Sequence, residues 1–333
     1  MYFIAEIGVN HEANIKKAFK CIKDAKDGGA HAVKLQCYKA EKLASKYAGA
    51  YWDKKEEAEN SQLKLYQKFD KFEFKHYEKI VQYCKKIKID FIITPFDTDT
   101  VGFFKTRVKY FKISSSDITN LPLIKKIANT KKPVILSTGA STKIEIKRAF
   151  NILRKKSKKI IILHCILNYP TKKENANLNM ILDLKKDYKE VGLSDHSIPI
   201  DSHKILIYSY LLGVRFIEKH FTINKKKKGN DHFHSFDKKD LKIFFENLND
   251  LKIILGKKFK TFLKSEIISR KNARRSIFFN KDLKKNQKIK RDDLIMLRPA
   301  IGISPFEVNK IYNKRLRKNK LSGELLRLSD LKK

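Results

Sequence analysis

Cysteine is scarce in this chain of 333 residues, which contains four. No two of them, among Cys21, Cys37, Cys84 and Cys165, have the C-x-x-C spacing typical of zinc and redox sites. The cysteines therefore indicate neither a zinc site nor a disulfide framework. A chain of this kind is typical of a reducing compartment, so we expect a cytoplasmic protein.

Long apolar runs are also missing, because no stretch approaches the roughly 20 apolar residues that a membrane-spanning helix needs. The first residues, MYFIAEIGVNHE, are apolar but lack the basic start and the small-residue cleavage site of a signal peptide. We therefore expect no membrane association, and we interpret this segment as the first strand of the fold.

Acidic residues are few, since 36 Asp and Glu stand against 75 Lys and Arg and give a formal net charge of +39. A nucleic-acid partner is one interpretation of such a charge. The lysines, however, are spread over expected helix ends and loops and are not interleaved with aromatic residues in one stripe. We favour a solvated basic surface without a nucleic-acid partner, whose field would still attract a small anionic substrate.

What the chain does contain is a series of eight short apolar runs rich in β-branched residues. Amphipathic stretches such as IKKAFKCIKDAK separate most of them. Near-continuous apolar strands that alternate with helices are typical of buried parallel strands, and eight such units predict an α/β fold, a closed (β/α)8 TIM barrel. The runs span residues 2–8, 31–37, 90–96, 110–115, 133–139, 159–165, 190–196 and 214–221.

The pattern changes after the eighth run and its following helix. We predict a barrel domain over residues 1–255, a basic linker over 256–273 and a small, mostly β domain over 274–333, where short runs such as RSIFFN and IMLRPA occur. The connection 38–89 is longer than the others. It can hold an extra segment over the barrel mouth, where long loops are often functional.

Polar residues end each predicted strand, at the side of a TIM barrel where active sites lie. Side chains alternate between the two faces of a strand. Three pairs therefore share a face: Lys34 with Gln36, Ser194 with His196, and Glu218 with His220. Lysines and hydroxyls are suited to a phosphate or carboxylate, and histidines to a metal ion.

Simpler interpretations exist for the same residues. A single histidine in a strand is more often a hydrogen-bonded core residue than a ligand, and a lysine at a strand end usually extends to water. The residues alone therefore leave both roles open for His196 and His220, and they identify no reaction.

The order and spelling of nine motifs add a resemblance that covers essentially the whole chain. The series closely resembles the sialic acid synthase family, whose members make nonulosonic acids from phosphoenolpyruvate and an N-acylated hexose. The end of the chain, from RRSIFFN to AIGISP, resembles that family's antifreeze-protein-like (SAF) domain. The motifs are AEIGVNHEANIKKAF, AVKLQCYKAE, ITPFD, FKISSSDITNLPLI, VILSTG, LHCILNYPT, VGLSDHS, IEKHFT and GNDHFHSFD.

The resemblance implies roles for individual positions. Glu6 and Asp117 are candidates for proton transfer, and His196 and His220 match the two histidines that bind a divalent metal, usually Mn²⁺ or Mg²⁺. The positions that match phosphoenolpyruvate-binding residues are Lys34, Thr94, Lys112, Ser115, Ser137 and Ser194. The sugar-binding matches are Glu6, Asn60, Tyr169, Asp231 and Arg298. In the family the arginine reaches the partner subunit's sugar, which implies a domain-swapped homodimer.

Some positions depart from the family pattern. Asp117 stands where the family usually has an acid of glutamate length, Ile166 and Leu167 replace polar residues, and Asn230 replaces the proline of GPDH. The expected function is condensation of phosphoenolpyruvate with N-acetylmannosamine or a related diacetamido sugar. A legionaminate or pseudaminate synthase is the alternative, and a paralogue without turnover or a nucleic-acid-binding protein is a more distant one.

Overall fold

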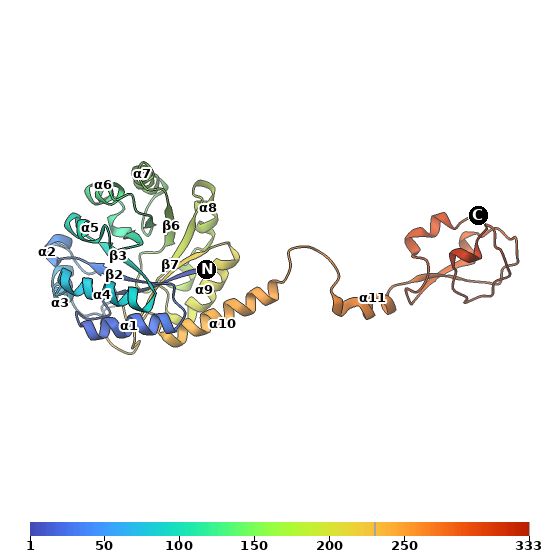
Figure 1. Ribbon diagram of the computed structural model, residues 1–333, viewed down its shortest axis with the longest axis horizontal. Coiled ribbons are helices and arrows are strands. Elements are labelled where there is room, and N and C mark those ends of the chain that lie inside the picture. Colours follow the sequence, from blue (N-terminus) through green and yellow to red (C-terminus); the bar gives the residue numbers. More distant parts are fainter. Residues whose placement is uncertain (230, 333) are drawn as a thin grey trace. The chain divides into compact units, whose positions relative to one another are not determined.

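The computed structural model describes residues 1–229 and 231–332, and the chain divides into two compact units, residues 1–254 and 255–333. In the described part of the first unit, eight parallel strands close into a barrel with the order of the sequence, and β8 pairs with β1 (Figure 1). The predicted TIM barrel is thereby confirmed. The strands are β1 Tyr2–Gly8, β2 Ala32–Cys37, β3 Asp90–Pro95, β4 Tyr110–Ile113, β5 Val134–Ser137, β6 Ile160–Cys165, β7 Val191–Asp195 and β8 Phe216–His220.

Helices surround the barrel, and their ends follow from the local sequence (Figure 1). Asn14 begins the first one by accepting hydrogen bonds from two backbone amides, and Thr142 and Glu145 form a capping box. No described helix is both long and apolar enough to cross a membrane. The helices are α1 Ile15–Asp27, α2 Ala40–Leu43, α3 Gln62–Phe69, α4 Phe74–Ile87, α5 Thr98–Phe104, α6 Leu121–Asn129, α7 Lys143–Arg154, α8 Asn179–Asp187, α9 Pro199–Leu211 and α10 Lys238–Leu255.

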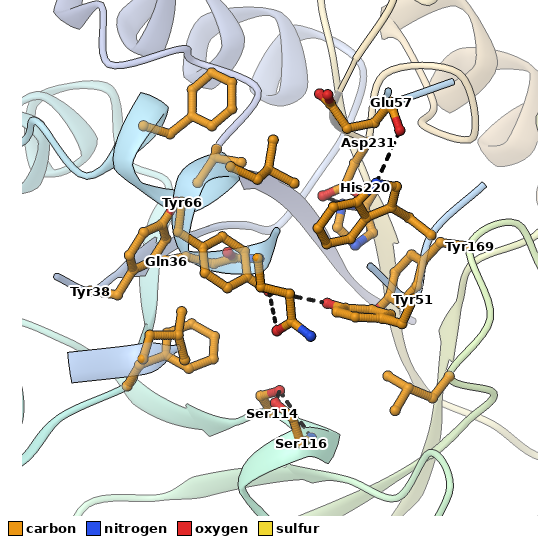
Figure 2. A pocket seen from close by; sticks show the side chains of 18 of the residues that line it. Gln36, Tyr38, Tyr51, Glu57, Tyr66, Ser114, Ser116, Tyr169, His220 and Asp231 are labelled. Carbon is orange, nitrogen blue, oxygen red and sulfur yellow. Dashed lines mark hydrogen bonds and ion pairs between the residues drawn. The ribbon is translucent and has the colours of Figure 1, made fainter. Parts of the chain in front are cut away.

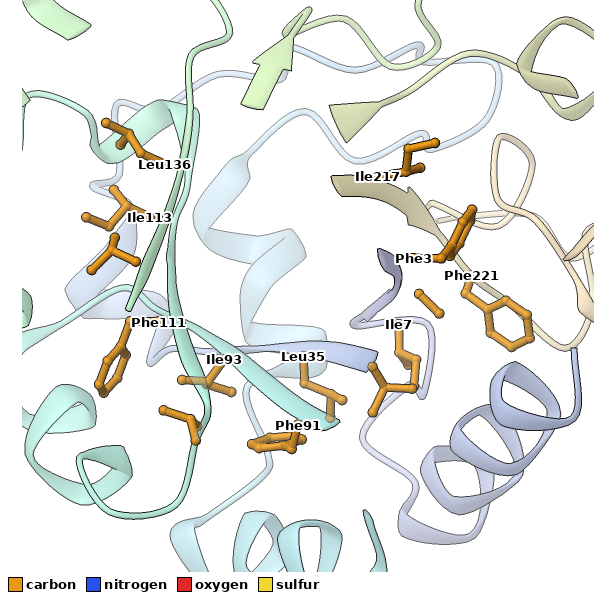
Figure 3. Packing of buried hydrophobic residues seen from close by; sticks show 14 of the residues in the cluster. Phe3, Ile7, Leu35, Phe91, Ile93, Phe111, Ile113, Leu136, Ile217 and Phe221 are labelled. Carbon is orange, nitrogen blue, oxygen red and sulfur yellow. The ribbon is translucent and has the colours of Figure 1, made fainter. Parts of the chain in front are cut away.

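The main core lies between the strands and the surrounding helices. Alternate strand residues such as Phe3, Leu35, Phe91 and Phe111 point outward and pack with the buried helix faces (Figure 3). A separate, smaller apolar cluster fills the barrel interior near the start of the strands. It consists of Ile4, Ala32, Ile92, Tyr110, Ile135, Ile161 and Leu163.

The position of the inner cluster determines where polar groups can lie. Two residues after Ile4 along β1 comes Glu6, and the same step leads from Ala32 to Lys34 on β2. Because every second side chain of a strand points to the same face, an apolar layer closes the bottom of the barrel and a polar layer lies above it. Gly192 on β7 is needed within this packing, because an added Cβ would lie 2.5 Å from the Phe216 carbonyl oxygen.

The second unit has its own small core. The strands β9 Ser276–Phe279 and β10 Leu294–Leu297 pair antiparallel, and buried residues such as Ile277, Phe279 and Leu316 pack together. Along the chain, a 3-10 turn, Lys264–Glu266, and the helix α11 Ile267–Ala273 precede β9.

Candidate active site

The polar layer lines a small inner cavity at the carboxyl ends of the barrel strands. Most of its residues are buried, although a barrel interior needs no polar side chains for packing. All six of the predicted phosphoenolpyruvate-binding positions are brought together here, beside both predicted metal-binding histidines and Glu6. The lining includes Glu6, Lys34, Thr94, Lys112, Ser115, Ser137, Cys165, Ser194, His196, Glu218 and His220.

Two lysines and two carboxylates form a charge network in this cavity. The Lys34 ammonium lies 2.8 Å from Glu6 Oε1 and donates to Thr94 Oγ1 at 2.9 Å. The Nζ atoms of Lys34 and Lys112 both lie 3.7 Å from Glu218 Oε1. Glu218 therefore connects the two ammonium groups and offsets part of their charge.

Burial and these neighbours change the proton affinity of each group. Burial raises the pKa of Glu6 and lowers that of Lys112. Burial alone would raise the pKa of Glu218, but Lys112 and Lys34 hold it below its usual value. Lys34 is the opposite case, because Glu218 and Glu6 raise its pKa against the effect of burial. Of the two carboxyl groups in the cavity, Glu6 therefore holds a proton more readily than Glu218 does.

Hydroxyl groups complete the wall of the cavity. Ser194 donates to Glu218 Oε1 at 3.1 Å, and Ser115 accepts a hydrogen bond from the Gly139 amide at 2.9 Å. Ser137 Oγ is buried without a hydrogen-bond partner in the described residues. A buried hydroxyl left unpaired costs about 1–3 kcal/mol, so a bound polar ligand would offset this cost.

The two predicted metal-binding histidines lie side by side, with ring centroids 5.4 Å apart. His196 donates from Nδ1 to the Ile166 carbonyl at 2.8 Å, if that nitrogen carries the proton, and Nε2 then has a free lone pair. The His220 Nδ1 atom lies 3.3 Å from Asp231 Oδ2. Ligand atoms of His220, Asp231 and His234 all lie within 4.8 Å of one another.

This cluster is suited to a divalent ion because several of its ring nitrogens are unpaired. His220 Nδ1 and both ring nitrogens of His234 are buried and have no hydrogen-bond partner in residues 1–229 and 231–332. Burial lowers the pKa of both imidazoles well below the usual value, and each also lies near other imidazole or ammonium groups. Neutral imidazole is the form that binds metals, so these side chains are ready to act as ligands.

An outer pocket opens above the inner cavity, and its lining combines eight aromatic side chains with five carboxylates. The long connection between β2 and β3, with α2, α3 and α4, supplies Tyr38, Tyr51, Trp52 and Tyr66. Figure 2 shows Tyr51 near Tyr169, and their ring centroids are 6.1 Å apart. Such rings favour the carbon-bound faces and methyl groups of a ligand, while their hydroxyls offer hydrogen bonds.

The predicted sugar-binding residues differ in their placement. Tyr169 and Asp231 line the outer pocket, together with Asp117, whose pKa burial raises. Asn60 lies in the β2–β3 connection and is not part of the pocket lining. Its backbone oxygen accepts a hydrogen bond from the Ala50 amide. Arg298 is an exposed residue of the second unit. The roles of these residues stay predictions.

The departures from the family pattern also have places in the structure. Ile166 contributes its backbone carbonyl to His196, a contact that does not depend on its side chain. The Leu167 side chain lines both cavities. Asn230 lies outside the described residues.

Sequence reasoning assigned no role to Glu218 or His234. Strand alternation did place Glu218 on the face of His220, but it does not show which charged groups Glu218 meets there. His234 follows no periodic pattern, since it lies in the irregular loop after β8. On the opposite strand face, the buried Asp195 carboxylate pairs with Lys219 at 2.7 Å, which explains its position away from the cavity.

Comparisons with known proteins find relatives of the chain in both sequence and fold. The model of the NeuB family matches residues 21–260, and that of the SAF domain matches residues 274–332. The chain is 37% identical to the N,N'-diacetyllegionaminic acid synthase of Campylobacter jejuni subsp. jejuni serotype O:2, over 97% of this chain and 98% of the relative. It is 31% identical to the N-acetylneuraminate-9-phosphate synthase of Drosophila melanogaster, over 76% and 68%.

Solved structures show the same likeness. The N-acetylneuraminic acid synthetase of Leptospira borgpetersenii, solved in complex with citrate, is 31% identical and has a TM-score of 0.69 over 80% of this chain and 89% of that chain. A spore coat polysaccharide biosynthesis protein E from Chromobacterium violaceum, described as putative, has a TM-score of 0.82 over 100% and 99%, and at 21% identity it supports the fold alone.

Proposed function

Because the chain belongs to the NeuB family of nonulosonic acid synthases, we propose that it condenses phosphoenolpyruvate with an open-chain hexose that carries acetamido groups, and releases phosphate. The observation that carries this proposal is the pair of buried lysines, Lys34 and Lys112, in a cavity rimmed by hydroxyls and next to a histidine cluster. The small anion phosphoenolpyruvate matches the lysine-lined cavity, and the polar aldehyde of the sugar matches the histidine cluster.

The inner cavity is the proposed site of phosphoenolpyruvate. Lys34 and Lys112 stabilise the phosphate and carboxylate charges, since buried ammonium groups act on an anion more strongly than exposed ones. The Ser137 hydroxyl, which has no partner among the described residues, donates to the same anion, and Ser194, whose hydroxyl donates to Glu218, lines the cavity beside it. The apolar layer beneath them stops the ligand from entering more deeply.

In the proposed reaction, the π electrons of the C2=C3 bond of phosphoenolpyruvate form a bond from C3 to the aldehyde carbon of the sugar, which leaves positive charge at C2, and the aldehyde oxygen takes a proton. Water adds to C2 and loses a proton. The resulting C2 hydroxyl then loses its own proton to form the C2=O ketone as the C2–O bond to phosphate breaks and phosphate leaves. A divalent ion, Mn²⁺ or Mg²⁺, held by His196 and His220 would supply Lewis acidity toward the aldehyde. Glu6, whose pKa is raised by burial and which lines the inner cavity, is the proposed proton carrier there, and Asp117 is the candidate in the outer pocket.

The lining of the outer pocket favours a sugar with two acetamido groups as the second substrate. Tyr38, Tyr51, Trp52 and Phe233 present apolar ring surface to a ligand, which suits the methyl ends of acetamido substituents. A relative at 37% identity is named for the N,N'-diacetyl product, which favours a legionaminate-type sugar over N-acetylmannosamine. N-acetylneuraminate synthesis remains the second candidate, because a solved structure at 31% identity is named for N-acetylneuraminic acid and a relative at 31% identity is named for its 9-phosphate.

A substrate panel tests the proposal. Purified full-length protein with Mn²⁺ or Mg²⁺ is mixed with phosphoenolpyruvate and either N-acetylmannosamine or diacetamido hexoses, and phosphate and product mass are measured. We expect sugar-dependent phosphate release, with the fastest turnover on a diacetamido sugar. Phosphoenolpyruvate binding without product from any sugar would instead indicate a paralogue without turnover, and salt-sensitive nucleic-acid binding alone would contradict the proposal.

A pair of serine variants tests the anion site without a change in the fold. Ser137→Ala and Ser157→Ala each remove a buried hydroxyl that has no partner in the described part of the chain. Ser137 lies in the inner cavity, whereas Ser157 lies between α7 and β6 at the other end of the barrel. We expect Ser137→Ala to raise the KM of phosphoenolpyruvate roughly 13- to 160-fold, the equivalent of one hydrogen bond of about 1.5–3 kcal/mol to a charged group, and Ser157→Ala to leave it unchanged.

A further inference from the structure

His234 is a buried histidine whose hydrogen-bonding capacity is unused. Its side chain has 0% exposure, and neither ring nitrogen has a hydrogen-bond partner among the described residues. Buried polar atoms in folded proteins are nearly always paired, so an imidazole with both nitrogens free calls for an explanation.

Three buried histidines outside the proposed ion site, His11, His164 and His232, do not share this property. His232, two residues away, places Nδ1 2.7 Å from Thr222 Oγ1 and Nε2 3.2 Å from Glu12 Oε1. His164 places Nε2 2.8 Å from the Ala176 carbonyl oxygen. His11 accepts from the Ala13 amide at Nδ1 but leaves Nε2 buried and unpaired among the described residues. These three histidines each pair at least one ring nitrogen, whereas His234 pairs neither, so a packing role alone does not account for His234.

The surroundings of His234 show what its nitrogens face. Its ring centroid lies 4.9 Å from that of His220 and 6.3 Å from that of His196. Its Nε2 atom lies 3.8 Å from Asp231 Oδ1. Figure 2 shows Asp231 beside His220 at the edge of the outer pocket. His234 therefore points a free nitrogen at the same space as two other potential ligands.

We propose that His234 is a further ligand of the divalent ion, and that with His220 and Asp231 it makes the site selective for a transition-metal ion over Mg²⁺. This inference rests on the proposed function and deepens it. Metal–nitrogen bonds are about 2.0–2.1 Å long, so donors around one ion lie roughly 3–4 Å apart. The three ligand atoms already lie within 4.8 Å of one another, so small side-chain rotations bring them to these distances.

The selectivity follows from the ligand types. Mg²⁺ prefers oxygen ligands and keeps several of its waters, whereas imidazole suits later first-row ions. Two imidazoles and one carboxylate, with His196 adjoining, give a nitrogen-rich set that a Mg²⁺ ion uses poorly. Co²⁺ serves as the probe, because its visible absorption reports the kind and number of its ligands.

The variants separate a ligand role from a structural one. His234→Ala and His234→Gln both remove the imidazole, and the second keeps most of the volume. The control is His203→Gln on α9, a histidine that stacks on Phe236 and lies near Asp240, away from the cavity lining. Circular dichroism and thermal melting show whether each variant is folded.

The measurement is a titration of the metal-free full chain with CoCl₂, followed by absorption and calorimetry, and a parallel titration with MgCl₂. We expect wild type to bind Co²⁺ on the order of 100-fold more tightly than Mg²⁺. A folded His234 variant should lose at least about tenfold in Co²⁺ affinity with a changed absorption band, and the control should match wild type. The inference is overturned if wild type does not prefer Co²⁺, or if the folded His234 variants bind it with unchanged affinity and spectrum.

These titrations contain no substrate, so their outcome does not depend on whether the proposed reaction takes place. If the variants behave as expected but no sugar yields product, the proposed function is wrong and the ion site stands. If product forms and the variants bind Co²⁺ like wild type, only the role of His234 is wrong.

Discussion

Glu218 offers a test of the charge balance in the inner cavity. Its carboxylate lies 3.7 Å from the Nζ atoms of both Lys34 and Lys112, and the two lysines keep it ionised. An anionic ligand bound by the same lysines is repelled by this carboxylate. Glu218→Gln removes the repulsion with little change in shape and leaves an oxygen that can still accept from Ser194.

The magnitude follows from the distances. Two unit charges about 4 Å apart interact by about 1 kcal/mol in water and about 4 kcal/mol at an effective dielectric constant near 20. In the proposed site the ligand binds on the far side of the lysines from Glu218, so its charge is farther from the carboxylate than this. We therefore expect Glu218→Gln to tighten phosphoenolpyruvate binding by about 1–2 kcal/mol, or roughly 5- to 30-fold. Lys112→Met should weaken binding by about 1.5–3 kcal/mol, the value of a charged hydrogen bond.

The assay is calorimetric titration of phosphoenolpyruvate into the full chain without sugar. The double variant of Lys112→Met and Glu218→Gln restores the wild-type net charge, so its affinity should fall between those of the single variants. Glu190→Gln is the control, because Glu190 lies 3.4 Å from Lys159 just before β7, at the opposite end of the barrel. Weaker binding by Glu218→Gln would refute the reasoning, since it would mean that the carboxylate orders the lysines more than it repels the ligand.

Three further predictions concern other parts of the chain. Asp195→Asn leaves the buried Lys219 ammonium without its charged partner and should lower the free energy of unfolding by about 3–5 kcal/mol, seen as a lower urea midpoint in the fluorescence of the single tryptophan, whereas Asp201→Asn should change it little. Trp52→Ala removes ring surface from the outer pocket and should raise the KM of the sugar but not of phosphoenolpyruvate. Arg298→Ala should do the same in steady-state kinetics, and equal effects on both substrates would contradict its predicted role.

The strands and the faces of their side chains could be predicted from the sequence because both depend on local order. Alternation with a period of two places Lys34 on the face of Gln36, and Ser194 on the face of His196, whatever the rest of the chain does. The same rule directed Asp195 away from the cavity, where it pairs with Lys219. The collinear motifs extended this local information to the family.

Which residues these side chains contact depends on the closure of the barrel, and closure cannot be predicted from the local sequence. β8 pairs with β1, so Glu6 lies opposite His220 in the register and close to the Glu218 network, although more than 200 residues separate them in sequence. His234 and the aromatic pocket belong to loops without a repeating pattern, so only packing against the strands brings them to the site. The sequence by itself determined which side chains point into the barrel, and the tertiary structure decided which of them meet, because a closed ring makes neighbours of its two ends.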